Sequence, residues 1–178
     1  MSHIADIDGM RLTMPEGWWV WKYDDSSFHR NQFQSFAGGS KAVDAVALAS
    51  EGTLWLIEVK DYRRQRRSKP SSVFAEVAAK AQATLAGLAT ARVRANDQAE
   101  KSLAHKAMGC TQIRVALQMA QPVTRSRLFP QVVDPADAQI QLRRVLRAVD
   151  PHALCVTGII GSDRLPWSTV AMRADGSP

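Results

Sequence analysis

Residues 41–60 read KAVDAVALASEGTLWLIEVK and predict two apolar β-strands joined by a turn near Gly52. The first strand carries Asp44, and the second ends with Glu58 and Lys60. Charged side chains are scarce in buried strands, because an unpaired buried charge costs several kcal/mol or is neutralised. Three charged residues on one hairpin therefore indicate a functional site.

The length of the turn decides whether Asp44 joins the other two side chains. Successive side chains of a strand point to opposite faces, so Glu58 and Lys60 share one face. A two-residue loop would set Asp44 opposite Val59, on the wrong face, whereas a three-residue loop sets it opposite Glu58. Three-residue loops favour glycine at their last, left-handed position, where Gly52 falls. We therefore expect the three-residue register, or a bulge with the same effect.

An Asp followed, one hairpin later, by Glu-x-Lys at a strand end resembles the pattern of the PD-(D/E)XK nuclease superfamily, which has a restriction-endonuclease-like fold. The resemblance covers the hairpin, the basic segment after it and the following helix. It implies that Asp44 and Glu58 bind Mg²⁺, with Mn²⁺ as a substitute. It further implies that the Val59 carbonyl completes the metal shell and that Lys60 assists the attacking water. The chain departs from the pattern where Val43 replaces the usual proline.

These groups suit a metal-assisted attack on a phosphodiester bond. Mg²⁺ takes oxygen ligands, typically one or two carboxylates together with waters and substrate phosphate. The ion polarises the phosphoryl group and lowers the pKa of a bound water. A lysine beside it is either a base or a charged stabiliser of the transition state, and the sequence leaves both roles open. In the alternative interpretation, the three residues make surface salt bridges worth about 0–1 kcal/mol.

The segment directly after Lys60 is rich in cations. The chain has 23 Lys and Arg against 17 Asp and Glu, a net charge of +6, and a positive field attracts polyanions. The five cations of this segment are Arg63, Arg64, Arg66, Arg67 and Lys69. A basic run alone is usually a solvated loop, but its place beside the motif predicts contact with nucleic-acid phosphates. We expect DNA rather than RNA, because the resembled superfamily mostly cuts DNA.

Weaker candidates lie outside the motif. Five acids precede Asp44, and the sequence leaves open whether any of them approaches the metal. The candidates that we favour among them are Asp24 and Asp25, which end an aromatic-rich strand at residues 17–23. Several branches of the superfamily place a Gln or Lys from the next helix in the site, which points to Lys80 and Gln82. From the residues alone, both belong on the exposed face of that helix.

Hydrophobic periodicity extends the hairpin into an α/β chain. Helices are expected over 71–92, 97–109 and 135–149, and further strands over 113–119, 153–160 and 168–172. This order predicts a mixed central β-sheet flanked by helices, with a restriction-endonuclease-like core and a C-terminal strand extension. We expect one nuclease-like domain over residues 1–178, with its core at about 15–120 and the C-terminal helix and strands at 134–173.

Composition excludes several other classes of protein. No stretch approaches the ~20 uninterrupted apolar residues of a membrane span, and no signal peptide is visible. Cys110 and Cys155 are expected to pack as free thiols, which indicates a reducing cytoplasm. The four histidines are scattered, without metal-ligand spacing.

The sequence therefore predicts a small cytoplasmic Mg²⁺-dependent nuclease. A chain of 178 residues holds no obvious recognition domain, so specificity would come from a partner subunit, from a homodimer or from substrate structure. That profile suits a restriction, repair or anti-phage system. The alternative is a catalytically inactive nuclease-fold protein that binds nucleic acid or a protein partner.

Overall fold

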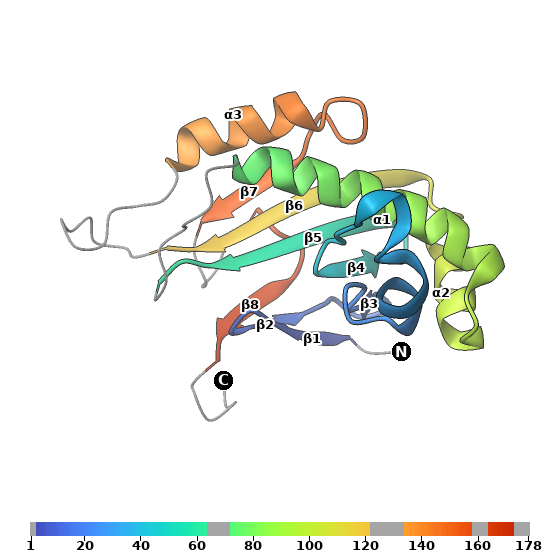
Figure 1. Cartoon of the computed structure of the whole chain (residues 1–178). Helices are drawn as coiled ribbons and strands as arrows, with labels where there is room; N and C mark the ends of the chain where they lie inside the picture. The colour runs from blue at the N-terminus through green and yellow to red at the C-terminus, as the bar shows by residue number, and fades with distance from the viewer. Residues whose placement is uncertain (1–2, 64–71, 122–133, 158–163, 173–178) are drawn as a thin grey trace.

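The five-stranded sheet at the centre of the molecule is mixed. The computed structural model describes residues 3–63, 72–121, 134–157 and 164–172 (Figure 1). In order across the sheet, the strands are β3 (Trp19–Trp21), β4 (Ala45–Leu48), β5 (Thr53–Asp61), β6 (Gln112–Ala120) and β7 (Leu154–Thr157). The pairs β3–β4 and β4–β5 are antiparallel, whereas β5–β6 and β6–β7 are parallel. The expected α/β class with a mixed sheet is confirmed.

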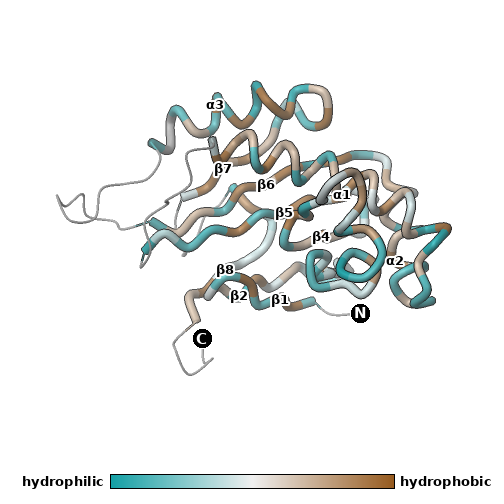
Figure 2. The backbone as a smooth tube through the Cα atoms, in the orientation of Figure 1, coloured by the Kyte–Doolittle hydropathy of each residue, from teal (hydrophilic) through white to brown (hydrophobic). Residues whose placement is uncertain are grey.

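In the part of the chain that the structure describes, the helices lie on one face of this sheet. The helices α1 (Val73–Arg94) and α3 (Pro135–Val145) lie on that face, and α2 (Gln98–Ala107) packs against α1 (Figure 1). The opposite face packs against a second sheet, so the expectation of helices flanking the sheet holds on one side. Because both faces of β5 are covered, residues 53–59 are all buried. Figure 2 shows hydrophobic stretches, in brown, along the strands of the central sheet.

The second sheet has three antiparallel strands, in the order β1 (Ile4–Ile7), β2 (Met10–Thr13) and β8 (Ser168–Ala171). The β1–β2 hairpin is not among the elements expected from the sequence. The signal was present, because Asp8-Gly9 between apolar residues is typical of a two-residue hairpin turn. Both turn residues have the positive φ that such a turn needs, 47° and 73°. Met10 and Leu12 of β2 are fully buried against the central sheet.

The other elements lie close to their expected positions. The expected strand at 17–23 is reduced to β3, whose Trp19 faces the helices while Val20 faces the second sheet. Helix α2 begins after Asp97, whose carboxylate accepts a hydrogen bond from the backbone N–H of Glu100. The last expected strand, at 168–172, is β8, and the expected strand at 153–160 is described as far as Thr157. No helix in the described ranges is long and apolar enough to cross a membrane.

Two short helices connect β3 to β4. They are the π-helical turn η1 (His29–Phe33) and the 3₁₀ turn η2 (Phe36–Gly38). Phe33 of η1 and Phe28, which directly precedes η1, are buried in the core cluster that α1 also joins. This connection therefore lies alongside α1, where Figure 1 shows it in front of β3 and β4.

Candidate functional site

The hairpin has the register that the three-residue loop predicts. In the β4–β5 ladder, Ala45 lies opposite Ile57 and Leu48 opposite Leu54. Ala49 donates a backbone hydrogen bond of 2.9 Å to the carbonyl of Thr53, which closes the loop. Gly52, at the end of the loop, has a φ of 88°. The expectation of an odd-length loop with a left-handed glycine is confirmed.

Asp44 lies immediately before β4 rather than inside it, and its carboxylate is attached to β5. The Oδ2 atom accepts a hydrogen bond of 2.7 Å from the backbone N–H of Val59. The preceding residue, Val43, donates its backbone N–H to Thr84 Oγ1 on α1 at 3.0 Å, so the chain leaves the ladder there. These two bonds place Asp44 next to Glu58, on the face of the sheet that α1 covers.

Glu58 is the most deeply buried acid of the site, with 1% of its surface exposed. Two ammonium groups reach its Oε1 atom: Lys60 Nζ and Lys80 Nζ each lie 2.6 Å away. Its other oxygen, Oε2, is buried and has no hydrogen-bond partner among the residues that the structure describes. One oxygen of Glu58 therefore carries two ion pairs while the other remains free to accept a ligand.

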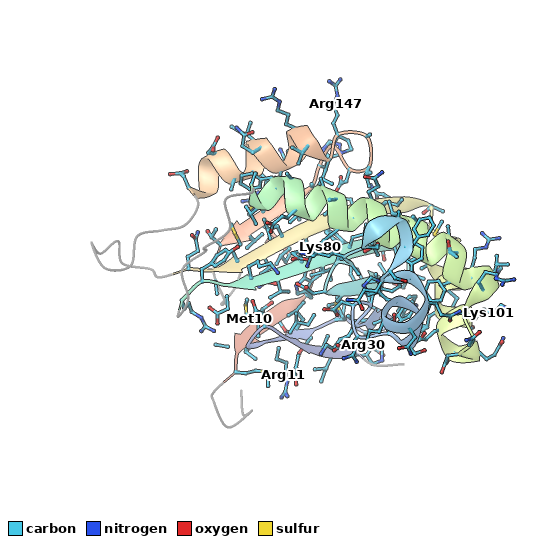
Figure 3. The ribbon with its side chains drawn as sticks, viewed as in Figure 1. Met10, Arg11, Arg30, Lys80, Lys101 and Arg147 are labelled. Atoms are coloured by element: carbon cyan, nitrogen blue, oxygen red, sulfur yellow. The ribbon has the colours of Figure 1, made fainter. Side chains whose placement is uncertain are left out.

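The expectation that Lys80 lies on the exposed face of its helix is wrong, because its side chain is partly buried. It extends from α1 toward β5 (Figure 3), and its Nζ also donates to Asp44 Oδ1 at 3.3 Å. Because one ammonium reaches both acids, Asp44 Oδ1 and Glu58 Oε1 are no more than about 6 Å apart, the combined length of the two contacts. Gln82, two residues further on, is exposed and contributes instead to the lining of a neighbouring groove.

The pKa values of the cluster reflect its burial and its mixed charges. Burial raises the pKa of Glu58, and the nearby Asp44 raises it further, against the opposing effect of the two lysines. Burial lowers the pKa of Lys60, but the charges of Glu58 and Asp44 outweigh this and raise it to about 12. Without a bound ion, Lys60 is therefore a cation at neutral pH. Its role beside a bound ion, as a base or as a charged stabiliser, stays a prediction.

The two weaker acidic candidates differ in their surroundings. Asp24 Oδ1 is buried without a hydrogen-bond partner in the described part of the chain, and burial together with Asp44 and Asp25 raises the pKa of its carboxyl. Asp25 pairs with Lys22 at 2.9 Å and with Arg30 at 3.9 Å. Both acids line a cavity of about 290 Å³ together with Asp44, Val59 and Lys60, but only Asp24 has a buried oxygen without a partner among the described residues.

His29 belongs to the same region, although sequence analysis assigned no role to any histidine. It lines a cavity of about 260 Å³ together with Asp24 and Lys80. The pKa of His29 is lowered by burial and by the charge of Lys80, so the ring is neutral at pH 7. No spacing in the sequence signals this position, because the turn η1 that holds it is irregular.

The basic segment is described only at its first residue. The Arg63 guanidinium pairs with the Asp61 carboxylate through two contacts of 2.8 and 2.6 Å, so this cation is already engaged. Arg64, Arg66, Arg67 and Lys69 lie outside the described residues. Their contact with phosphates stays a prediction.

The donor set can be tested for its fit to Mg²⁺. Among the described residues, no three His, Cys, Asp or Glu side chains form a group that could hold a metal ion. Asp44 and Glu58 supply two neighbouring carboxylates, and Glu58 Oε2 is buried without a partner in the described structure. Two carboxylates with waters and substrate oxygens are a usual Mg²⁺ environment, so the residues fit the ion. The role of the Val59 carbonyl stays a prediction.

A comparison with curated proteins found a sequence similarity for this chain. The chain is 32% identical over 166 residues to a protein named cysteine–tRNA ligase from Neisseria meningitidis serogroup A. The matched region covers 75% of this chain and 24% of that protein, so the chain spans about a quarter of its length. No family model and no solved structure matches the chain.

Proposed function

We propose that this chain is a Mg²⁺-dependent nuclease with a restriction-endonuclease-like core that hydrolyses phosphodiester bonds, in DNA rather than RNA. The observation that carries the proposal is the register of the β4–β5 hairpin, which brings Asp44, Glu58 and Lys60 to one face of the sheet. A register shifted by one residue would have separated Asp44 from the other two. The mixed sheet with a helix packed over the hairpin is compatible with such a core.

In this proposal, Asp44 and Glu58 hold the ion through their carboxylate oxygens. The ion, when bound, supplies Lewis-acid stabilisation of the phosphoryl group and a water of lowered pKa. In the same proposal, Lys60 is the charged group that would stabilise the negative charge developing on the phosphoryl oxygens. Lys80 provides a second cation at the same carboxylates and helps to position them.

A specific observation favours the alternative, an inactive nuclease-fold protein that binds nucleic acid or a protein partner. Lys60 and Lys80 already balance the charges of Asp44 and Glu58 without any metal. A cluster that is neutral by itself has less need of a divalent cation. The two proposals therefore differ in whether a metal displaces the lysines from Glu58.

A cleavage assay separates these proposals. The protein is incubated with plasmid, linear duplex, single-stranded DNA and RNA, with Mg²⁺, Mn²⁺ or EDTA. Transfer RNA belongs among the substrates, because the curated relative is named for a reaction on it. Metal-dependent cleavage that disappears in Asp44→Asn, Glu58→Gln and Lys60→Met supports the nuclease. Binding by the parent protein without cleavage on any substrate supports the inactive alternative.

We further propose that a partner subunit or a second copy of the chain supplies specificity. We propose that the protein belongs to a defence, restriction or repair system, in which cleavage and recognition are carried by different subunits. A cytoplasmic location accords with the free thiols of Cys110 and Cys155.

A further inference from the structure

A groove runs beside the candidate site, between α1 and the turns η1 and η2. It has a volume of about 620 Å³, within the range of small-molecule sites. Its lining includes Phe33, Phe36, Lys41, Lys80, Ala83 and Ala86. We refer to it as the aromatic groove.

Phe36 gives this groove an exposed aromatic face. Its side chain is 60% exposed, and it is the one phenylalanine among the exposed large hydrophobic residues of the described chain. Its ring stacks on Phe33 with a centroid distance of 5.2 Å and an interplanar angle of 28°. Phe33 stacks in turn on the buried Phe28 at 5.8 Å. The ring is therefore held by a stack that begins in the core, which leaves its outer face open to a ligand.

Lys80 connects the aromatic groove to the candidate site. This residue lines the groove, and its Nζ contacts Glu58 Oε1 and Asp44 Oδ1. Lys41, which is exposed, adds a second cation to the lining, against the single acid Glu76. A ligand that suits this groove is flat and apolar at one end and anionic at the end that approaches Lys80. A nucleotide has that chemistry, with its base and its phosphate.

We propose that the aromatic groove holds an unpaired nucleobase of the substrate strand, stacked on Phe36, while the adjoining phosphate passes Lys80. This rests on the proposed function, since it concerns the substrate of the same site. A base inside a duplex is stacked on both sides and offers no free face, so the groove selects single-stranded or locally unpaired nucleic acid. Stacking on an aromatic side chain is tolerant of sequence, so the groove selects strand structure rather than base identity.

Binding in EDTA tests the proposal without requiring cleavage. Fluorescently labelled single strands and a blunt duplex are titrated with the parent protein, Phe36→Ala, Phe36→Leu and Phe36→Trp. We expect Phe36→Ala to weaken single-strand binding about fivefold or more, Phe36→Trp to retain it, and duplex binding to stay unchanged. Phe36→Leu, which keeps apolar volume without a ring, should resemble Phe36→Ala. Ile140→Ala on α3, which removes another exposed hydrophobic side chain (66%), is the matched control and should bind as the parent does.

A series of strands with single abasic sites locates the stacked base. At one position, removing the base should cost the parent as much as Phe36→Ala does, and should cost Phe36→Ala itself nothing further. Equal binding by the parent and Phe36→Ala, or no binding to single strands at all, would overturn the groove proposal and leave the cleavage test of Asp44 and Glu58 unaffected. Phe36-dependent binding without any cleavage would support the groove and count against the nuclease.

Discussion

Asp44 Oδ2 accepts a 2.7 Å hydrogen bond from the backbone N–H of Val59, the residue between Glu58 and Lys60. The carboxylate thus binds the backbone of the strand that carries the other two charged side chains. The two strands are joined at this point through a side chain instead of a ladder bond, because Val43 has turned to Thr84. The position of Asp44 is therefore fixed by the hairpin itself.

Asp44 has a structural role, as the acceptor of the Val59 hydrogen bond, and a proposed role as a metal ligand. Substitutions can separate these two roles. We expect Asp44→Ala to reduce the free energy of unfolding by about 1–3 kcal/mol, because it leaves the buried N–H of Val59 without its acceptor. Asp44→Asn keeps an oxygen that can accept the bond and should be close to the parent in stability. Both variants should lose metal-dependent cleavage. Urea denaturation and a cleavage assay check the pair, and equal destabilisation by Asn and Ala would contradict the structural role of the bond.

The sequence predicts the part of the site that depends on strand alternation. Once the loop is assigned three residues, period-two geometry places Asp44, Glu58 and Lys60 together without further information. The position of Lys80 could not be obtained in this way, because it depends on how α1 docks over the sheet. The pairing of Arg63 with Asp61 is a local contact that competes with the expected phosphate contact. The β1–β2 hairpin was missed despite its Asp-Gly turn.

If Asp44 and Glu58 bind a metal ion as proposed, Lys80 should compete with it, because its ammonium contacts both carboxylates. We expect Lys80→Met to tighten Mn²⁺ binding several-fold, because the ammonium no longer occupies Glu58 Oε1. The same change should lower kcat about tenfold or more, because a cation near the scissile phosphate is lost. Isothermal titration and single-turnover cleavage measure the two effects. The control is Lys106→Met on α2, an exposed lysine of another helix, and unchanged metal affinity in Lys80→Met would refute the competition.

Glu58 should make the metal-free protein less stable as the pH rises. Its pKa is raised in the folded state by burial and by Asp44, so the folded protein binds the proton more tightly than the unfolded chain does. The stability that the protonated carboxyl confers is complete below the unfolded pKa, near 4.5, and decreases as the pH rises through the folded pKa. The parent should therefore lose stability relative to Glu58→Gln as the pH rises above about 4.5 in EDTA. Urea unfolding across this range checks the slope, and a pH-independent difference would count against the raised pKa.

Gly52 secures the loop that sets the register. Its φ of 88° is unfavourable for other residues, and an added Cβ would lie 3.2 Å from Thr111 Oγ1. We expect Gly52→Ala to cost about 1–2 kcal/mol from the left-handed conformation alone, with an additional loss from the Thr111 contact. Gly38→Ala is the matched control, because Gly38 has a φ of 82° and no neighbour within 4 Å of the added Cβ. Thermal denaturation should give Gly52→Ala a lower melting temperature than Gly38→Ala. The reverse order would show that Thr111 does not restrict the loop.

The most direct test of the account is the anomalous diffraction of a crystal soaked in Mn²⁺. We expect a peak within about 2.2 Å of carboxylate oxygens of both Asp44 and Glu58, accompanied by displacement of Lys80 from Glu58 Oε1. The same crystals of Asp44→Asn should lose the peak. Saturating Mn²⁺ with no peak between the two acids, and with both lysines still paired to Glu58, would contradict the metal-dependent mechanism.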